Sequence, residues 1–180
     1  MLAEGAMPAS EQIPKQLPAP AGLPHHRSII AVDIERSTTR INPVKAEQRR
    51  TVYELFDAAL RSAGIQERHR DRFIDRGDGI LALIHPVDQA PKALLLTRAI
   101  PALHRLNADH NDSLPRASQP QRQMRLRVVI HAGEVHYDAN GCFGEALDVA
   151  FRLLDAPRVK MALKTAPGPL LHVVSSDVYG

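Results

Sequence analysis

The sequence predicts an α+β fold: a mostly antiparallel β-sheet with helices on one face and a ferredoxin-like βαββαβ sandwich order in its first part. Three observations lead to this prediction. Short apolar runs rich in β-branched residues are typical of strands, longer stretches repeat apolar residues at helical spacing, and a glycine-rich turn joins two neighbouring strands. The predicted order is strand, helix, hairpin, helix, strand, then strand, helix, strand.

The first predicted elements are a strand and a helix. Residues 28–33 are an apolar β-rich run, and residues 35–41 form a turn rich in hydroxyl groups. Pro43 suits a helix start, because its φ is already helical and its missing N–H would be unpaired there anyway. Apolar residues then recur at helical spacing until Gly64, a typical helix end. This helix is expected to bury one face.

A hairpin and a second helix are expected next. The apolar runs 73–76 and 80–84 flank the turn 77–79, and glycines so close together are typical of a β-hairpin. Pro91 can open the following helix. Pro101 is expected to kink that helix, because proline removes one of its hydrogen bonds.

The last third of the chain predicts a loop, two strands, a helix and a final strand. Residues 107–123 are polar and contain prolines, which indicates an exposed loop. Residues 125–131 are expected to form a strand, and residues 133–137 to turn into a second one. A helix over 144–154 and a strand over 170–174 complete the prediction.

One domain preceded by a tail is the expected organisation. Of the 180 residues, 44% are hydrophobic, which suffices for a single core. Residues 1–26 contain five prolines among polar residues and are expected to be a flexible tail, so the domain spans 27–180. The only cysteine is Cys142, and no apolar run is long enough to span a membrane. A cytoplasmic protein without membrane contact is expected.

The charge of the chain only weakly favours an anionic partner. The formal net charge is +3, and the basic residues are spread along the sequence. The densest basic segment, 66–72, is interrupted by acidic residues and has no interleaved aromatic residues on which bases could stack. We therefore expect no nucleic-acid partner.

Two carboxylates are placed where a site could form. Asp33 ends the first predicted strand, and Asp78 lies at the tip of the hairpin. In a βαββαβ arrangement these elements are neighbours, so the two carboxylates can converge. Mg²⁺ prefers such oxygen ligands together with substrate phosphates, and a second metal could activate a hydroxyl nucleophile. The backbone amides of residues 34–38 could receive phosphate oxygens. Either carboxylate alone is more often an ordinary turn residue, and it is the pair in this order that favours a functional site.

Three motifs in the chain resemble the catalytic domain of the class III nucleotidyl cyclases, the adenylate and guanylate cyclase family. They are Val32-Asp-Ile-Glu-Arg-Ser-Thr38, Arg76-Gly-Asp-Gly79, and Val129-Ile-His-Ala-Gly-Glu-Val135 running on to Phe143-Gly-Glu-Ala-Leu-Asp-Val-Ala-Phe-Arg152. They cover the chain from about residue 28 to its end, and their order makes the set fairly specific. The resemblance implies conversion of a nucleoside triphosphate to a 3′,5′-cyclic mononucleotide and pyrophosphate, with Mg²⁺ or Mn²⁺, in a homodimer.

The resemblance also implies roles for individual residues. Asp33 and Asp78 would be the two metal ligands, with the carbonyl of Ile34 as a third. The turn that follows would bind the nucleotide through Glu35, Arg36, Ser37 and Thr38. Arg152 would stabilise the pentacoordinate phosphorus. Because such cyclases work as head-to-tail dimers, the metal ligands and Arg152 would come from opposite subunits.

The sequence departs from the family pattern at four positions. The family often has glycine where Arg36 stands, and its ribose-orienting asparagine falls on Asp148. The purine-selecting lysine falls on Ile74, and its acidic partner at about Gly141. Neither side chain can hydrogen-bond a base, so the sequence leaves the choice among ATP, GTP and a pyrimidine triphosphate open.

A family lysine that acts in the transition state lies in a late β-hairpin. That hairpin would follow Tyr179, and the sequence ends at Gly180. The resemblance therefore implies that the domain lacks its last β-hairpin.

Two other functions stay open at this stage. A catalytically silent relative, binding nucleotide or a partner protein as a dimer, is favoured by Asp148, Ile74 and Gly141. A basic nucleic-acid-binding module is supported only by the net charge of the chain.

Overall fold

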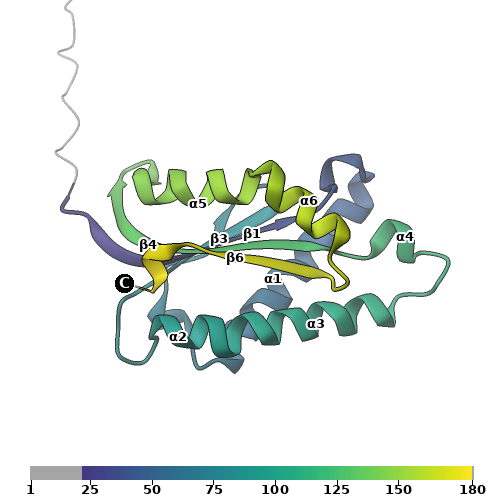
Figure 1. Ribbon diagram of the computed structural model, residues 1–180, viewed down its shortest axis with the longest axis horizontal. Coiled ribbons are helices and arrows are strands. Elements are labelled where there is room, and N and C mark those ends of the chain that lie inside the picture. Colours follow the sequence, from purple (N-terminus) through teal and green to yellow (C-terminus); the bar gives the residue numbers. More distant parts are fainter. Residues whose placement is uncertain (1–21, 180) are drawn as a thin grey trace, which may run out of the picture.

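The computed structural model describes residues 22–179, which form a central sheet flanked by helices (Figure 1). The sheet has six strands in the order β2-β3-β1-β4-β5, with β6 paired to β4. Their bounds are β1 His25–Ile34, β2 Ile74–Asp75, β3 Gly79–Ile84, β4 Leu126–Asp138, β5 Gly141–Phe143 and β6 Leu170–Val174. β1 runs antiparallel to both β3 and β4, whereas β4 and β6 are parallel. The predicted α+β class and mostly antiparallel sheet are confirmed.

The helices account for most of the remaining described chain. Their bounds are α1 Asn42–Ser62, α2 Lys92–Leu94, α3 Ile100–Ser113, α4 Gln119–Arg122, α5 Glu145–Asp155 and α6 Pro157–Thr165. A π-helical turn, Leu95–Ala99, joins α2 to α3. It ends two residues before Pro101, which cannot donate the regular helical hydrogen bond, and the helix continues through this proline to Ser113.

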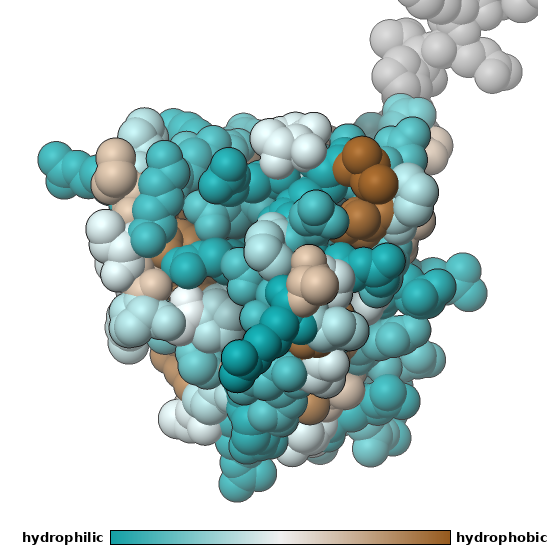
Figure 2. Space-filling view, turned by 90° about the vertical axis from the view of Figure 1, so that its right-hand side faces the viewer, coloured by the Kyte–Doolittle hydropathy of each residue, from teal (hydrophilic) through white to brown (hydrophobic). Residues whose placement is uncertain are grey.

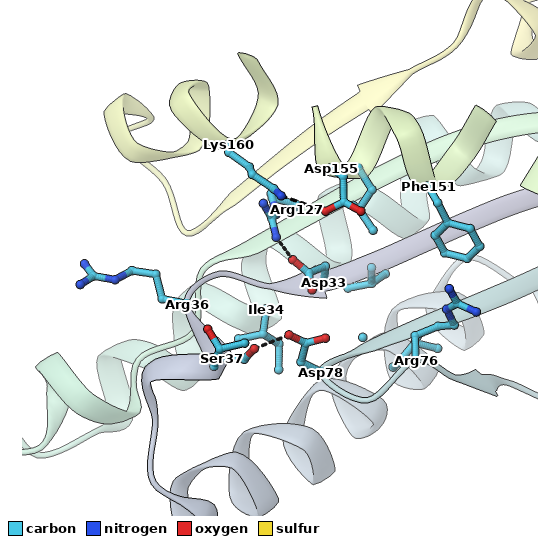
Figure 3. Close-up of a pocket in the computed structure, with 15 residues that line it drawn as sticks. Asp33, Ile34, Arg36, Ser37, Arg76, Asp78, Arg127, Phe151, Asp155 and Lys160 are labelled. Carbon is cyan, nitrogen blue, oxygen red and sulfur yellow. Dashed lines mark hydrogen bonds and ion pairs between the residues drawn. The ribbon is translucent and has the colours of Figure 1, made fainter. Parts of the chain in front are cut away.

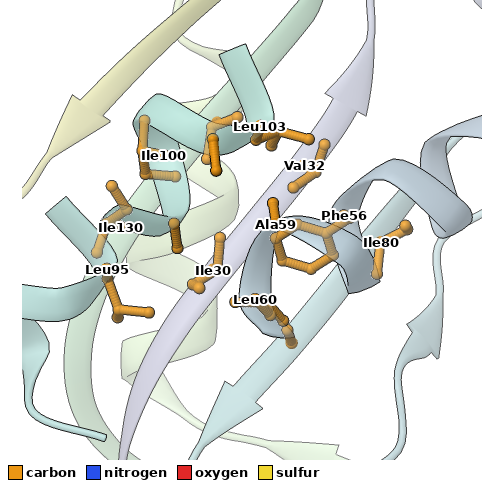
Figure 4. Packing of buried hydrophobic residues seen from close by; sticks show 14 of the residues in the cluster. Ile30, Val32, Phe56, Ala59, Leu60, Ile80, Leu95, Ile100, Leu103 and Ile130 are labelled. Carbon is orange, nitrogen blue, oxygen red and sulfur yellow. The ribbon is translucent and has the colours of Figure 1, made fainter. Parts of the chain in front are cut away.

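Helices cover both faces of the sheet, which corrects the expectation of helices on one face. α5 and α6 lie on one side, and α1, α2 and α3 on the other (Figure 1). Successive side chains of β1 point to opposite faces of the sheet and pack in different clusters. Ile30 lies in a buried cluster with Phe56 of α1 and Leu103 of α3 (Figure 4), and Ala31 lies in a second cluster with Ala150 of α5. The uninterrupted apolar run at 29–32 is typical of a strand buried on both sides.

β4 is one long strand rather than the two predicted over 125–131 and 133–137. Gly133 does not start a turn there; it allows α5 to approach the strand. A Cβ atom at Gly133 would lie 2.7 Å from the Cβ of Ala146, closer than two carbon atoms can pack. The glycine is therefore a packing requirement of the strand.

The predicted exposed loop at 107–123 is wrong over most of its length, because α3 continues to Ser113 and α4 occupies Gln119–Arg122. The polar residues there are partly internal. The Asn107 side chain is fully buried and donates to the carbonyls of Met124 (3.3 Å) and Pro169 (3.1 Å). Asn111 also donates to Met124, at 2.8 Å. These asparagines tie α3 to the segment before β4, so their polarity does not indicate solvent exposure.

Other segments also differ from the expected pattern, among them β5, which was not predicted. α6 was not predicted, because it follows α5 almost directly and Leu163 is its only buried residue. β1 begins at His25, so two residues assigned to the expected tail belong to the sheet. The rest of that tail, up to residue 21, lies outside the described residues.

The described surface is mainly polar. Figure 2 shows a face on which hydrophilic side chains prevail and apolar ones form small separate groups. Within residues 22–179, no helix has the length and apolar character needed to cross a membrane.

A half-buried hydrogen-bond network around Asp71, a loop residue before β2, joins β1, β4 and the residue that follows β3 at the end of the sheet where β1 begins. The Tyr137 hydroxyl donates to Asp71 at 2.6 Å, His85 Nε2 lies 2.8 Å from the other carboxylate oxygen, and Arg27 lies 3.6 Å away. Burial alone would raise the pKa of Asp71, but these partners hold it below its usual value. Burial and Asp71 together raise the pKa of Tyr137 to about 12.

Asp71→Asn is expected to lower the free energy of unfolding by about 1–2 kcal/mol at pH 7, because the charged hydrogen-bond acceptor is lost. The native pKa is depressed, so this stabilisation is complete above the unfolded pKa near ~3.9 and disappears as pH falls through the lower native pKa. Urea unfolding of wild type, Asp71→Asn and the exposed-site control Asp109→Asn from pH 3 to 7 measures it. If the free energy of unfolding of wild type exceeded that of Asp71→Asn by the same amount at pH 3 as at pH 7, the lowered pKa of Asp71 would be contradicted.

Candidate functional site

Asp33 and Asp78 lie side by side at one end of the sheet. Asp33 is the penultimate residue of β1, and Asp78 directly precedes β3, whose Gly79 pairs with Asp33. Both carboxylates line one pocket of about 360 Å³ (Figure 3). The convergence expected from the motifs is therefore present in the fold.

The two glycines around Asp78 explain this placement. Gly77 has a φ of 79°, a left-handed conformation that side chains disfavour. Gly79 lies so close to β1 that a Cβ atom there would be 2.3 Å from the carbonyl oxygen of Val32. The backbone then closes onto the end of β1, where the Ile34 amide donates to the Asp78 carbonyl at 3.3 Å. Glycine at both positions is needed to bring Asp78 against β1.

The two carboxylates have different partners. Asp33 forms an ion pair with Arg127 of β4, and both side chains are nearly buried. Burial raises the pKa of Asp33 above its usual value, Arg127 partly offsets this, and the nearby negative charges of Asp78 and Asp155 raise it further. Asp78 accepts a hydrogen bond from the Ser37 hydroxyl. Asp33 and Asp78 thus place two negative charges close together, which a bound cation would stabilise. We name this pocket the acidic pocket after its three carboxylates, Asp33, Asp78 and Asp155, although four cationic side chains also line it: Arg36, Arg76, Arg127 and Lys160.

The donor set suits a hard divalent cation. The carboxylates of Asp33 and Asp78 and the backbone of Ile34 lie on the same pocket wall, and all offer oxygen, the donor type that Mg²⁺ and Mn²⁺ prefer. Within residues 22–179, no group of three or more His, Cys, Asp or Glu side chains is arranged to hold a metal. Two carboxylates with the remaining positions left to substrate and water match the usual Mg²⁺ pattern.

The turn after Asp33 offers fewer amides to an anion than the sequence predicted. The amides of Ile34 and Glu35 already donate to the carbonyls of Asp78 (3.3 Å) and Arg125 (2.8 Å), so only those of residues 36–38 can remain for phosphate oxygens. Arg36 has φ 59° and ψ 26°, left-handed values that are rare for a residue with a Cβ atom. A 3₁₀ turn, Ser37–Thr39, follows, and the first amides of such a turn have no partner within it. Arg36, Ser37 and Thr38 all line the acidic pocket. The left-handed geometry also gives a physical reason for glycine at the position of Arg36.

Arg36→Gly is expected to be more stable to unfolding than Arg36→Ala by about 1 kcal/mol. Both variants remove the guanidinium, but only glycine relieves the left-handed strain. Urea denaturation of the matched pair measures the difference. An alanine variant as stable as the glycine variant would show that the turn changes conformation when the arginine is removed.

A second pocket, of about 630 Å³, contains three of the other predicted site residues: Ile74, Gly141 and Asp148. Arg152 lines neither pocket; it is exposed on α5, and its Nε donates to the backbone carbonyl of Asp148 at 3.4 Å. Glu35 also lies outside both, in an ion pair with Arg125 at 3.3 Å. Within one chain, the structure therefore separates Arg152 and Asp148 from the carboxylate pair Asp33 and Asp78.

Several residues of the acidic pocket were not predicted. Arg127 and Lys160 bring cations into it, and Lys160 pairs with Asp155 at 2.9 Å. Arg76 and Phe151 complete the wall, with the Arg76 guanidinium 4.1 Å from the centre of the Phe151 ring (Figure 3). No local pattern in the sequence indicates these residues, since Arg127, for example, reaches Asp33 only through the register of β4 against β1.

The fold was compared with known proteins. No protein-family model and no curated protein matches the chain, but solved structures do. A bacterial light-regulated adenylyl cyclase has 15% identity and a TM-score of 0.61 over 89% of this chain and 46% of its own. The adenylate/guanylate cyclase/hydrolase from Silicibacter pomeroyi has 19% identity and a TM-score of 0.57 over 88% of this chain and 79% of its own.

A third similar structure is the monomeric guanylyl cyclase domain of the RhoGC fusion protein from the aquatic fungus Blastocladiella emersonii. It has 14% identity and a TM-score of 0.56 over 88% of this chain and 85% of its own. Identities this low establish the fold and not the activity. The chain therefore has the fold of the class III adenylate/guanylate cyclase catalytic domain, as its three motifs predicted.

Proposed function

We propose that residues 27–180 act as a nucleotidyl cyclase domain, converting a nucleoside triphosphate to a 3′,5′-cyclic mononucleotide and pyrophosphate. The observation that carries the proposal is the convergence of Asp33 and Asp78 in one pocket, beside the left-handed turn at Arg36. The cyclase fold supports it. The lone cysteine, Cys142, is consistent with a reducing cytoplasm, which we propose as the location.

Asp33, Asp78 and the Ile34 carbonyl would hold Mg²⁺ or Mn²⁺. Bound there, the cation would neutralise the triphosphate and help to deprotonate the attacking 3′-hydroxyl. The amides and side chains of the turn, with Ser37 and Thr38, would orient the phosphate chain. Arg127 lies beside Asp33, where its guanidinium can exchange a carboxylate partner for a phosphate oxygen.

The second half of the site would come from a second subunit. Arg152 would stabilise the charge that develops on the α-phosphate, and Asp148 would contact the ribose. Ile74 and Gly141 line the same pocket as Asp148, where the base would bind. Because Arg152 lies outside the acidic pocket of its own chain, a head-to-tail homodimer would bring the two halves together.

The proposal is tested by incubating the protein with each of ATP, GTP, CTP and UTP and Mn²⁺, and measuring pyrophosphate release. Release is expected with at least one triphosphate, and it should stop when the metal is chelated. Release that continues at the same rate in excess chelator would exclude the metal-dependent mechanism.

A catalytically silent nucleotide-binding dimer is the second candidate. Asp148 favours it, because its carboxylate has no ion-pair partner among the described residues and would lie near a polyanion. This candidate predicts nucleotide binding without pyrophosphate release under any metal.

A nucleic-acid-binding module has weaker support. In the basic segment 66–72, Arg70 is buried, pairs with Asp57 at 2.9 Å and stacks on Phe73 at 3.7 Å. The arginine at the centre of that segment therefore serves the core instead of an external phosphate chain.

A further inference from the structure

Arg76 is a cation fixed at the boundary between the two pockets. It lines both the acidic pocket and the pocket that contains Asp148, and so does Phe151 of α5. Its guanidinium carbon lies 4.1 Å from the centre of the Phe151 ring, within cation–π distance. Its own amide donates to Gly79 at 3.1 Å, which fixes its backbone in the turn. Arg76 and Phe151 thus form a shared wall with a fixed positive charge.

The charges around the acidic pocket show that Arg76 is available to a ligand. Arg127 pairs with Asp33, and Lys160 pairs with Asp155. By contrast, no carboxylate within residues 22–179 lies at ion-pair distance from Arg76. Its guanidinium contacts the Phe151 ring, and its charge also acts on the Cys142 thiol, where it partly offsets the rise in pKa that burial causes. A ring occupies only the face of a guanidinium, so the N–H groups on its edge stay free to donate.

The turn that carries Arg76 is held from the opposite side. Arg49 of α1 donates to the carbonyl of Gly77 and pairs with Asp75, the residues on either side of Arg76. The neighbouring carboxylate is therefore already neutralised by another arginine. The Arg76 guanidinium is planar, keeps free donors and is oriented by an aromatic ring. It also lies beside two carboxylates that suit a metal. Such a cation is well suited to bind phosphate oxygens.

We propose that Arg76 is a phosphate-binding residue, which contacts the triphosphate bound at Asp33 and Asp78 of the same chain, and that Phe151 is its positioning residue. This inference rests on the proposed nucleotide site and gives a role to Arg76, a residue of the second motif to which the cyclase resemblance assigned none. It also predicts that the contact depends on the number of phosphates, because a monophosphate cannot reach as many donors as a triphosphate.

The test is calorimetric titration with the 3′-deoxy analogues of ATP, GTP, CTP and UTP, which lack the attacking hydroxyl, in Mg²⁺. For the analogue that wild type binds most tightly, Arg76→Gln is expected to weaken binding at least about tenfold, the factor that ~1.4 kcal/mol represents. The same substitution should weaken binding of the corresponding monophosphate much less. Phe151→Leu, which keeps an apolar side chain, should cause a smaller loss of the same kind. Arg98→Gln, an exposed arginine on the π-helical turn, is the matched control and should bind like wild type.

The outcomes separate this inference from the proposed function. Triphosphate binding by wild type that Arg76→Gln leaves unchanged would overturn the role of Arg76 alone. An equal loss for triphosphate and monophosphate would also overturn it, because it would indicate a general disturbance of the site. Absence of triphosphate binding by wild type would overturn both. An unchanged thermal midpoint of Arg76→Gln, expected for an exposed side chain, excludes misfolding as the cause.

Discussion

Asp33→Asn and Asp78→Asn are each expected to lower metal-dependent pyrophosphate release at least about 10³-fold, a loss of ~4 kcal/mol of transition-state stabilisation. Asparagine keeps the shape of the side chain but removes the charge that holds a divalent cation. Initial rates with Mn²⁺, together with circular dichroism to confirm folding, measure the effect.

Asp109→Asn is the control for this prediction. Asp109 is exposed on α3 and does not line the acidic pocket, whereas Asp75 holds the turn before Asp78 through Arg49 and the Gly77 amide and is therefore unsuitable. The Asp109→Asn variant should retain a rate near that of wild type. Turnover that survives both Asp33→Asn and Asp78→Asn would place the metal site elsewhere.

Mixing two inactive variants is expected to restore activity. Asp78→Asn lacks one half of the site and Arg152→Ala lacks the other. If the halves come from opposite subunits, a mixed dimer contains one intact site. With free exchange of subunits, half of the dimers are mixed, so activity should return to about a quarter of the wild-type value. Equimolar mixing followed by a rate measurement tests this.

A mixture of Asp33→Asn with Asp78→Asn is the control, because both substitutions lie in the same half-site. No intact site can form in that mixture, and no activity should return. Equal recovery in both mixtures, or none in either, would contradict a site shared between subunits.

The sequence was informative about the order of elements because each carries a local signal. The hairpin at 73–84 has its glycines, α1 has an apolar stripe and Pro43, and β1 has an unbroken apolar run. It was less informative about layers. Consecutive residues of β1 are buried in two different clusters, one on each face of the sheet, so both faces must be covered by helices. The uninterrupted apolar run indicated this, but the ferredoxin-like model placed the helices on one face.

The residues of the candidate site likewise fall into those that the sequence predicts and those that only the fold reveals. Asp33 and Asp78 could be predicted, because each stands at a strand end within a short motif. Arg127 could not, since its pairing with Asp33 depends on the register between β1 and β4. Lys160 comes from α6, a helix without a strong apolar pattern, and the contact between Arg76 and Phe151 joins the hairpin to α5. Contacts between distant segments require the fold itself.

The mass of the product tests the central claim most directly. The protein is incubated with each of ATP, GTP, CTP and UTP and Mn²⁺, and the products are identified by mass spectrometry. The expected product is a cyclic mononucleotide, lighter than the linear monophosphate by one water, formed with an equal amount of pyrophosphate and missing in Asp78→Asn. A linear monophosphate or diphosphate as the main product, or no product with any triphosphate, would contradict cyclisation at this site.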